Sequence, residues 1–186
     1  MLEPTELLYA YAQGYFPMAI PEENDEIFWF KPDMRGIIPL EEFHISKNLR
    51  RLFNKHYFDL RINGDFEGTI RSCANREDTW ISEDIIKSYC KLNELGYGYS
   101  FETWRNGKLV GGLYGVAIGK VFFGESMFHT ETDASKIALI FLVEFMKENQ
   151  FKLLDTQYIN DHLKQFGAIE IPNEEYELLL EDALES

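Results

Sequence analysis

The alternation of apolar and polar positions changes its period near residue 97, and this change predicts a sheet in the middle of the chain. Asn106-Gly107 separates two alternating runs, which is the strongest short signal for a hairpin turn. Gly119-Lys120 turns the chain again. The pattern therefore predicts a three-strand meander over residues 97–104, 108–118 and 121–126.

The stretch after the meander is apolar on nearly every face. It reads "ASKIALIFLVEFMKE", and Asp133 stands in front of it as the expected N-cap. We expect a long helix that packs on both sides. "KLLDTQ", residues 152–157, follows as a buried strand. A right-handed crossover through the helix would make this strand the parallel neighbour of the third meander strand.

Shorter elements fill the rest of the chain. Helices are expected over residues 5–13, 44–55, 66–73, 83–95, 160–167 and 173–184, and strands over 26–30, 34–40, 57–62 and 168–171, with a turn at 15–18. The fold class is therefore α/β (α+β). A boundary near residues 54–64 would divide a small N-terminal domain, 1–58, from a larger domain, 59–186.

Composition narrows the class of protein. The chain has 186 residues, of which 45% are hydrophobic and 15% aromatic, as is typical of a globular fold. No apolar run approaches the roughly 20 residues that span a bilayer, and the N-terminus has no basic region typical of a signal peptide. Cys73 and Cys90 show no metal-binding spacing, so small buried hydrophobes are expected. These features predict a cytoplasmic protein with no membrane partner.

The charge is unevenly distributed. A net charge of −14 argues against broad, nonspecific binding to nucleic acid. The window 43–58 nevertheless contains no acid and carries Lys47, Arg50, Arg51 and Lys55. The helix predicted over 44–55 is amphipathic and has Lys47, Arg50 and Arg51 on one face, together with Asn54. Such a face is either a phosphate-binding patch or ordinary solvated surface.

Two carboxylates, those of Glu125 and Asp155, occur at positions that the sequence pattern predicts to be buried. Glu125 lies between Gly124 and Ser126 in the apolar run "KVFFGESMF", and an ionised group there needs water or a polar partner. Asp155 and Gln157 share one face of the strand that is predicted to lie beside it. Ligands favour the carboxyl ends of such strands, so the three side chains could converge on one cleft. In the alternative, Asp155 caps a loop and Glu125 is merely exposed.

Two further features each allow two interpretations. Trp80 precedes a predicted helix, either as a core residue that anchors this helix or as an aromatic platform for a nucleic-acid base. Gly111, Gly112 and Gly115 lie in one strand, where they indicate either a bulge or a close approach of backbone or ligand.

A series of motifs occurs in a fixed order along the chain: "LLYAYAQGYFP", "FWFKPDMRGIIP", "HISKNLRR", "SCANREDTWI", "GGLYGVA…GESMF", "ASK" and "LLDTQ". With these motifs the chain resembles the bacterial leucyl/phenylalanyl-tRNA–protein transferase family from about residue 5 to residue 171. The resemblance implies a mixed sheet like that of GCN5-related N-acetyltransferases behind a small N-terminal α/β domain. It implies an aminoacyltransferase of the N-degron pathway. Such an enzyme moves Leu or Phe, with Met as a further candidate, from aminoacyl-tRNA to a protein's N-terminal Arg or Lys. The aminoacyl ester is already activated, so neither a metal nor another cofactor is implied.

The resemblance also implies roles for individual residues. Asp155 would draw a proton from the attacking amine or orient it, with Gln157 holding the geometry and Glu125 in the acceptor pocket. The residues of the aminoacyl pocket would be Leu113, Phe122, Gly124, Met127 and Leu154. Trp80 would lie near the terminal adenosine, and Lys47, Arg50 and Arg51 would contact tRNA phosphates. Met18 departs from the family, which often has Trp after "FP".

Two other functions compete with this interpretation. An acetyl-CoA-dependent N-acetyltransferase would need a glycine-rich loop before the long helix, where backbone N–H groups bind the pyrophosphate. The loop here is "HTETDASK", with no glycine and two acids. A non-catalytic binder of basic N-termini would retain Glu125 but would have no use for Asp155 beside Gln157.

Overall fold

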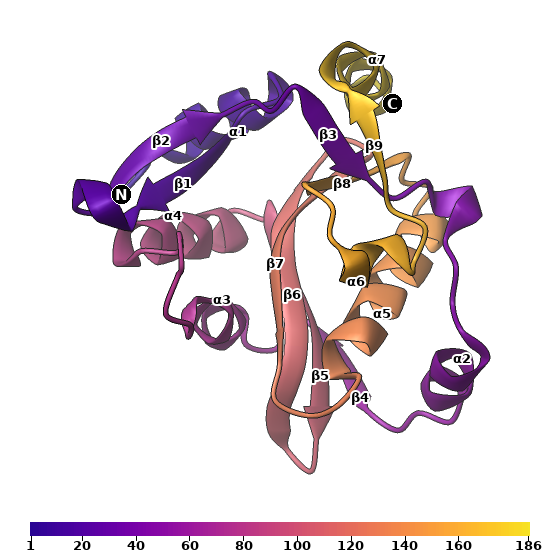
Figure 1. Cartoon of the computed structure of the whole chain (residues 1–186). Coiled ribbons are helices and arrows are strands. Elements are labelled where there is room, and N and C mark those ends of the chain that lie inside the picture. The colour runs from indigo at the N-terminus through magenta and orange to yellow at the C-terminus, as the bar shows by residue number, and fades with distance from the viewer.

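The computed structural model describes the whole chain, residues 1–186, as a seven-stranded mixed sheet, a separate two-stranded hairpin and seven α-helices (Figure 1). The strands are β1 (Phe16–Ile20), β2 (Glu26–Phe30), β3 (Met34–Ile37), β4 (Asp59–Ile62), β5 (Gly98–Arg105), β6 (Lys108–Ile118), β7 (Val121–His129), β8 (Leu153–Gln157) and β9 (Ile169–Pro172). The helices are α1 (Pro4–Ala12), α2 (Lys47–Asn54), α3 (Phe66–Ala74), α4 (Glu83–Glu94), α5 (Ala134–Glu148), α6 (Asp161–Lys164) and α7 (Asn173–Leu184). None of them has the length and apolar character that crossing a bilayer requires.

The sheet has the strand order β4-β5-β6-β7-β8-β3-β9. Strands β5, β6 and β7 form the predicted antiparallel meander, and β8 lies parallel to β7 after the crossover through α5. The predicted α/β class, the mixed sheet and the parallel pair are confirmed. Figure 1 shows α3 and α4 on one side of the meander and α5 on the other.

Each face of the sheet is covered by its own apolar core. Neighbouring residues of one strand enter different cores: Phe123 and Leu153 pack with α3 and α4, whereas Phe122 and Leu154 pack with α5. This alternation follows from the two-residue period of a strand. It also explains why α5 is apolar all round, because this helix lies between the sheet and α2 and is buried along most of its length.

Three local predictions need correction. Residues 15–18 were expected to form a turn, but Phe16–Ile20 pair with β2 as a strand. Pro17 is tolerated there because β1 pairs on one edge only. Asp133 stands at the start of α5 but has a left-handed backbone and makes no capping hydrogen bond from its side chain. Of the two free cysteines, Cys73 is buried as expected and Cys90 is only half-buried.

An early segment of the chain completes the main sheet. Strand β3 lies between β8 and β9 and is antiparallel to both. The N-terminal residues are therefore connected to the carboxyl-terminal half through backbone hydrogen bonds. The division into 1–58 and 59–186 stays a prediction.

The glycines of β6 permit both a bulge and a close approach of another element, the two interpretations that their positions allowed. The register between β6 and β7 shifts between Tyr114 and Gly115, which places a bulge there. Gly111 lets the start of α5 approach, since a Cβ atom at this position would lie 2.5 Å from that of Ala134.

We expect Gly115→Ala to destabilise the fold, because the added Cβ would overlap the carbonyl oxygen of Phe123 and lie 2.7 Å from the Phe122 ring. Overpacking of this kind lowers the free energy of unfolding by about 1–3 kcal/mol. Urea denaturation measures the change. Gly107→Asn is the control, because the turn at Gly107 is open and Asn tolerates its positive φ. Equal losses in the two variants would contradict this explanation of the glycine.

Candidate active site

A cavity of about 430 Å³ opens where the two parallel strands separate. The pairing of β7 with β8 ends at Phe123 and Asp155, so the residues that follow diverge. Side chains that pack with either of the two cores meet in this gap, at the carboxyl ends of the strands, where ligands of α/β proteins commonly bind. The candidate residues that line it are Trp80, Leu113, Gly124, Glu125, Met127, Leu154 and Gln157.

Glu125 is the polar centre of this cavity. Its side chain is 9% exposed, and Oε1 accepts hydrogen bonds from the Tyr11 hydroxyl and from Gln157 Nε2, the latter at 3.0 Å. Both bonds end on Oε1, so Oε2 has no donor within the protein. Burial raises the pKa of Glu125 to about 7, although the hydrogen bonds from Tyr11 and Gln157 act in the opposite direction. Glu125 therefore changes its charge near neutral pH.

Asp155 lies behind the cavity wall and is fully buried. Arg35 on β3 binds its carboxylate with two N–H groups, from Nε to Oδ1 at 3.0 Å and from Nη2 to Oδ2 at 2.6 Å. The Tyr176 hydroxyl donates to Oδ2 at 2.7 Å, and the backbone N–H of Gln157 donates to Oδ1 at 2.7 Å. These four bonds occupy the carboxylate within the protein.

Gln157 connects the two carboxylates. Its backbone has a φ of 64°, in the left-handed region, which ends the strand geometry of β8. Its N–H donates to Asp155 and its side-chain amide donates to Glu125. The structure thus brings Glu125, Asp155 and Gln157 together, with Glu125 and Gln157 at the cavity surface and Asp155 supporting them.

Apolar side chains form another part of the wall. Leu113, Met127 and Leu154 lie there with Leu139 and Leu142 of α5. Phe122 does not reach the cavity. Its ring packs edge-on against Phe101 at 5.7 Å in the core, at a position of β7 that is still paired with β8.

Trp80 lies in a third part of the wall, with Met18 and Arg76. Its backbone carbonyl accepts a hydrogen bond from Ala19, which connects the loop before α4 to the hairpin β1–β2. Trp80 is half-buried, packs against the core and lines the cavity. Its role as a platform for a base stays a prediction.

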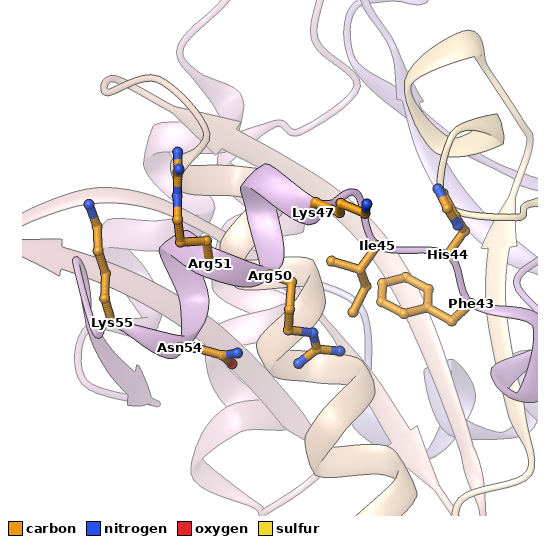
Figure 2. A pocket seen from close by; sticks show the side chains of 8 residues that line it. All are labelled: Phe43, His44, Ile45, Lys47, Arg50, Arg51, Asn54 and Lys55. Atoms are coloured by element: carbon orange, nitrogen blue, oxygen red, sulfur yellow. The ribbon is translucent and has the colours of Figure 1, made fainter.

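The basic helix α2 borders an open surface hollow of about 860 Å³ (Figure 2). Arg50 pairs with Glu144 of α5 at 3.3 Å, whereas Arg51 donates to the neutral Asn48 at 2.7 Å and Lys47 has no ion pair. In Figure 2, Arg51 and Lys55 extend to the same side of the helix, and Arg50 points to the other. The charges of Lys47, Arg51 and Lys55 are therefore the ones available to a ligand.

No cluster of three His, Cys, Asp or Glu side chains has an arrangement that could hold a metal ion. Four residues of the site that sequence reasoning missed are Tyr11, Arg35, Tyr89 and Tyr176, which hydrogen-bond to the carboxylates or, for Tyr89, to Tyr11. Arg35 carried a usable signal, since an arginine within the apolar stretch "MRGIIPL" needs a buried counter-ion.

Two family models match nearly the whole chain. One is described as leucyl/phenylalanyl-tRNA protein transferase and matches residues 37–181, and the other, described as the N-terminal domain of that transferase, matches residues 1–33. A leucyl/phenylalanyl-tRNA–protein transferase of Paramagnetospirillum magneticum is 51% identical over 182 residues, which cover 96% of this chain and 87% of that protein. That of Gloeobacter violaceus is 50% identical over 183 residues, covering 98% of this chain and 94% of that protein.

Proteins of known structure are less similar to this chain than the two relatives above. A GCN5-related N-acetyltransferase-like protein from Streptococcus suis is 14% identical, with a TM-score of 0.42 over 74% of this chain and 58% of that chain. This likeness is too weak to bear on function. The family models and the two relatives are decisive, because they match almost every residue of the chain. The chain belongs to the leucyl/phenylalanyl-tRNA protein transferase family of aminoacyltransferases.

Proposed function

We propose that the protein transfers Leu or Phe from aminoacyl-tRNA to the N-terminal amine of cytoplasmic proteins that begin with Arg or Lys, marking them for degradation by the N-degron pathway. The observation that carries this proposal is the meeting of Glu125 and Gln157 beside an apolar wall in one cavity. The apolar part suits the side chain of the donor amino acid. The carboxylate suits the cationic side chain of the acceptor.

The reaction needs positioning and proton transfer. The neutral amine of the acceptor attacks the carbonyl carbon of the ester, a C–N bond forms, and the bond to the ribose oxygen breaks. The amine's proton ends on the departing ribose. Because Gln157 Nε2 donates to Glu125, its carbonyl oxygen is free to accept a hydrogen bond from the amine. Glu125 Oε2 is the group that would meet the acceptor's side chain.

Asp155 acts in this scheme as a positioning residue. It is fully buried and accepts a hydrogen bond from the Gln157 backbone, so it fixes the residue that contacts the amine without touching the substrate itself. Of the two roles considered for Asp155, proton acceptor and orienting group, we therefore propose the second.

The leucine-rich wall favours large apolar donors and discriminates weakly among them. A methylene group in such a pocket changes the transition-state free energy by only about 1–3 kcal/mol. Donor specificity would therefore include Leu and Phe together, with Met as a third candidate. The residues proposed for this pocket are Leu113, Gly124, Met127 and Leu154, with Phe122 in support from the core.

The proposal is tested by transfer of labelled Leu, Phe and Met from their tRNAs to peptides that begin with Arg, Lys or Ala. We expect labelled Arg and Lys peptides, and little label on the Ala peptide. Acetylation of the same peptides from acetyl-CoA, with no transfer from tRNA, would overturn the proposal in favour of an acetyltransferase. Binding of the peptides without either reaction would favour a non-catalytic binder.

Glu125→Gln is expected to raise the KM for an Arg-starting peptide about 10- to 100-fold at pH 8, since hydrogen bonds to charged groups contribute about 1.5–3 kcal/mol. The wild-type KM should fall as the pH rises from 6 to 8, because the Glu125 pKa of about 7 means that the carboxylate ionises over this range. The acceptor's own amine titrates in both proteins, so the ratio of variant to wild-type KM isolates Glu125. A ratio that does not change with pH would contradict this role.

Asp155→Asn is expected to reduce transfer and also to destabilise the fold by about 3–5 kcal/mol, because it leaves the buried Arg35 without a counter-ion. The double variant Arg35→Gln/Asp155→Asn should regain part of this stability in denaturant titrations. It should not regain transfer if the charge of Asp155 is needed to hold Gln157. Full activity of the stabilised double variant would remove Asp155 from the mechanism.

Charge reversal at Lys47 and Arg51 should raise the KM for aminoacyl-tRNA and weaken its salt dependence. Each lost phosphate contact lowers the slope of log affinity against log salt by about 0.9. Arg50→Gln is the matched control and should have a smaller effect, because Glu144 already pairs with this arginine. Equal effects of the two changes would contradict the assignment of free charges on α2.

A further inference from the structure

Arg76 is an arginine of the cavity wall whose charge has no acidic partner. Arg35, Arg50, Arg61 and Arg71 each lie within 4.0 Å of a carboxylate oxygen, whereas Arg76 does not. The two acids that follow it in sequence, Glu77 and Asp78, are exposed and form no ion pair with it. Arg51 and Arg105 also lack an acidic partner, but Arg76 is the arginine that lines the cavity of Glu125. Its charge there favours an anionic ligand.

Neutral oxygen atoms hold the Arg76 side chain in place. Nε donates to the carbonyl oxygen of Cys73 at 2.9 Å, and Nη2 donates to Ser126 Oγ at 3.2 Å and to the carbonyl oxygen of Met127 at 3.1 Å. These bonds fix the guanidinium without neutralising it. Nη1 makes no hydrogen bond within the protein, and the residue is exposed. Arg76 is thus oriented, charged and accessible.

Arg76 lies where the terminal nucleotide of the donor, the aminoacyl-tRNA, would enter the cavity. Its guanidinium carbon lies 5.9 Å from the centre of the Trp80 ring, and both residues line the cavity that holds Glu125. If adenine stacks on Trp80, the ribose must direct its aminoacyl ester toward Gln157 and the leucine-rich wall. The 5′ side of the same ribose then leaves the cavity beside Trp80, where the first anionic group it carries is a phosphate.

We propose that Arg76 binds the phosphate on the 5′ side of the terminal adenosine of the donor, an inference that rests on the proposed function. Arginine suits this task because its planar N–H groups match phosphate oxygens and stay charged at every physiological pH. The cavity then contains two opposite charges with separate tasks. Glu125 attracts the cationic acceptor, and Arg76 repels it from the donor's place.

The test compares adenosine with adenosine 5′-monophosphate as competitive inhibitors of transfer from aminoacyl-tRNA. In the wild type, the monophosphate should inhibit with a constant about 10-fold or more below that of adenosine. Arg76→Gln should abolish this difference and raise the KM for aminoacyl-tRNA, with little change in the inhibition constant of adenosine. Arg76→Lys should keep part of the preference, since it keeps the charge.

Arg71→Gln is the matched control, because Arg71 is an exposed arginine of α3 outside the cavity, paired with Glu67 and Glu83. It should leave the preference for the monophosphate unchanged. Equal inhibition by the two ligands in the wild type would overturn the assignment. So would an Arg76→Gln variant that weakens both ligands equally, which would indicate a purely structural role. A wild type that transfers nothing from tRNA would instead refute the proposed function itself.

Discussion

The ion pair of Arg35 with Asp155 is the interaction on which the site depends. It joins residues 120 positions apart in the chain, and both side chains are fully buried. Arg35 also donates to the carbonyl oxygen of Gly14 at 2.7 Å and lies between the rings of Phe16 and Tyr176. One guanidinium therefore connects the hairpin, strand β3, strand β8 and helix α7. Removing either charge would leave the other buried and unpaired, which is much more costly than the net gain of such a pair.

The same ion pair also fixes the positions of residues at the cavity surface. Asp155 holds the backbone of Gln157 in a left-handed conformation, and Gln157 in turn holds Oε1 of Glu125. Hydrogen bonds from protein side chains thus fix the position of the Glu125 carboxylate. Burial keeps its pKa near 7, above its ordinary value of 4.5, so the ionised form destabilises the folded state as the pH rises between these values. A cationic group close to Oε2 would relieve that penalty, which is the physical basis of the contact proposed with the acceptor's side chain.

Most helices and strands could be predicted from the sequence, because the residues that determine them are close together in the chain. The Asn106-Gly107 turn, the two-residue period of the meander and the all-round apolar helix before β8 each depend on residues close in sequence. The right-handed crossover made the convergence of Glu125 with Asp155 and Gln157 one of two alternatives, and the structure brings the three together with Asp155 behind the cavity wall. The partners of these groups were not predictable in the same way. Tyr11 and Arg35 reach the site through the placement of α1 and of β3, which the pattern of their own segments does not specify.

The errors have a common physical cause. Pro17 and Asp133 were interpreted by their usual local preferences, as a turn residue and as a helix cap, but tertiary pairing with β2 and the left-handed backbone before α5 decided otherwise. The resemblance implies a place for Phe122 in the aminoacyl pocket, but its side chain packs in the core and does not line the cavity. Phe122 lies where β7 is still paired with β8, whereas Glu125 lies beyond the end of this pairing and reaches the cavity. The place where the two strands separate, rather than the motif itself, therefore determines which residues can meet a substrate.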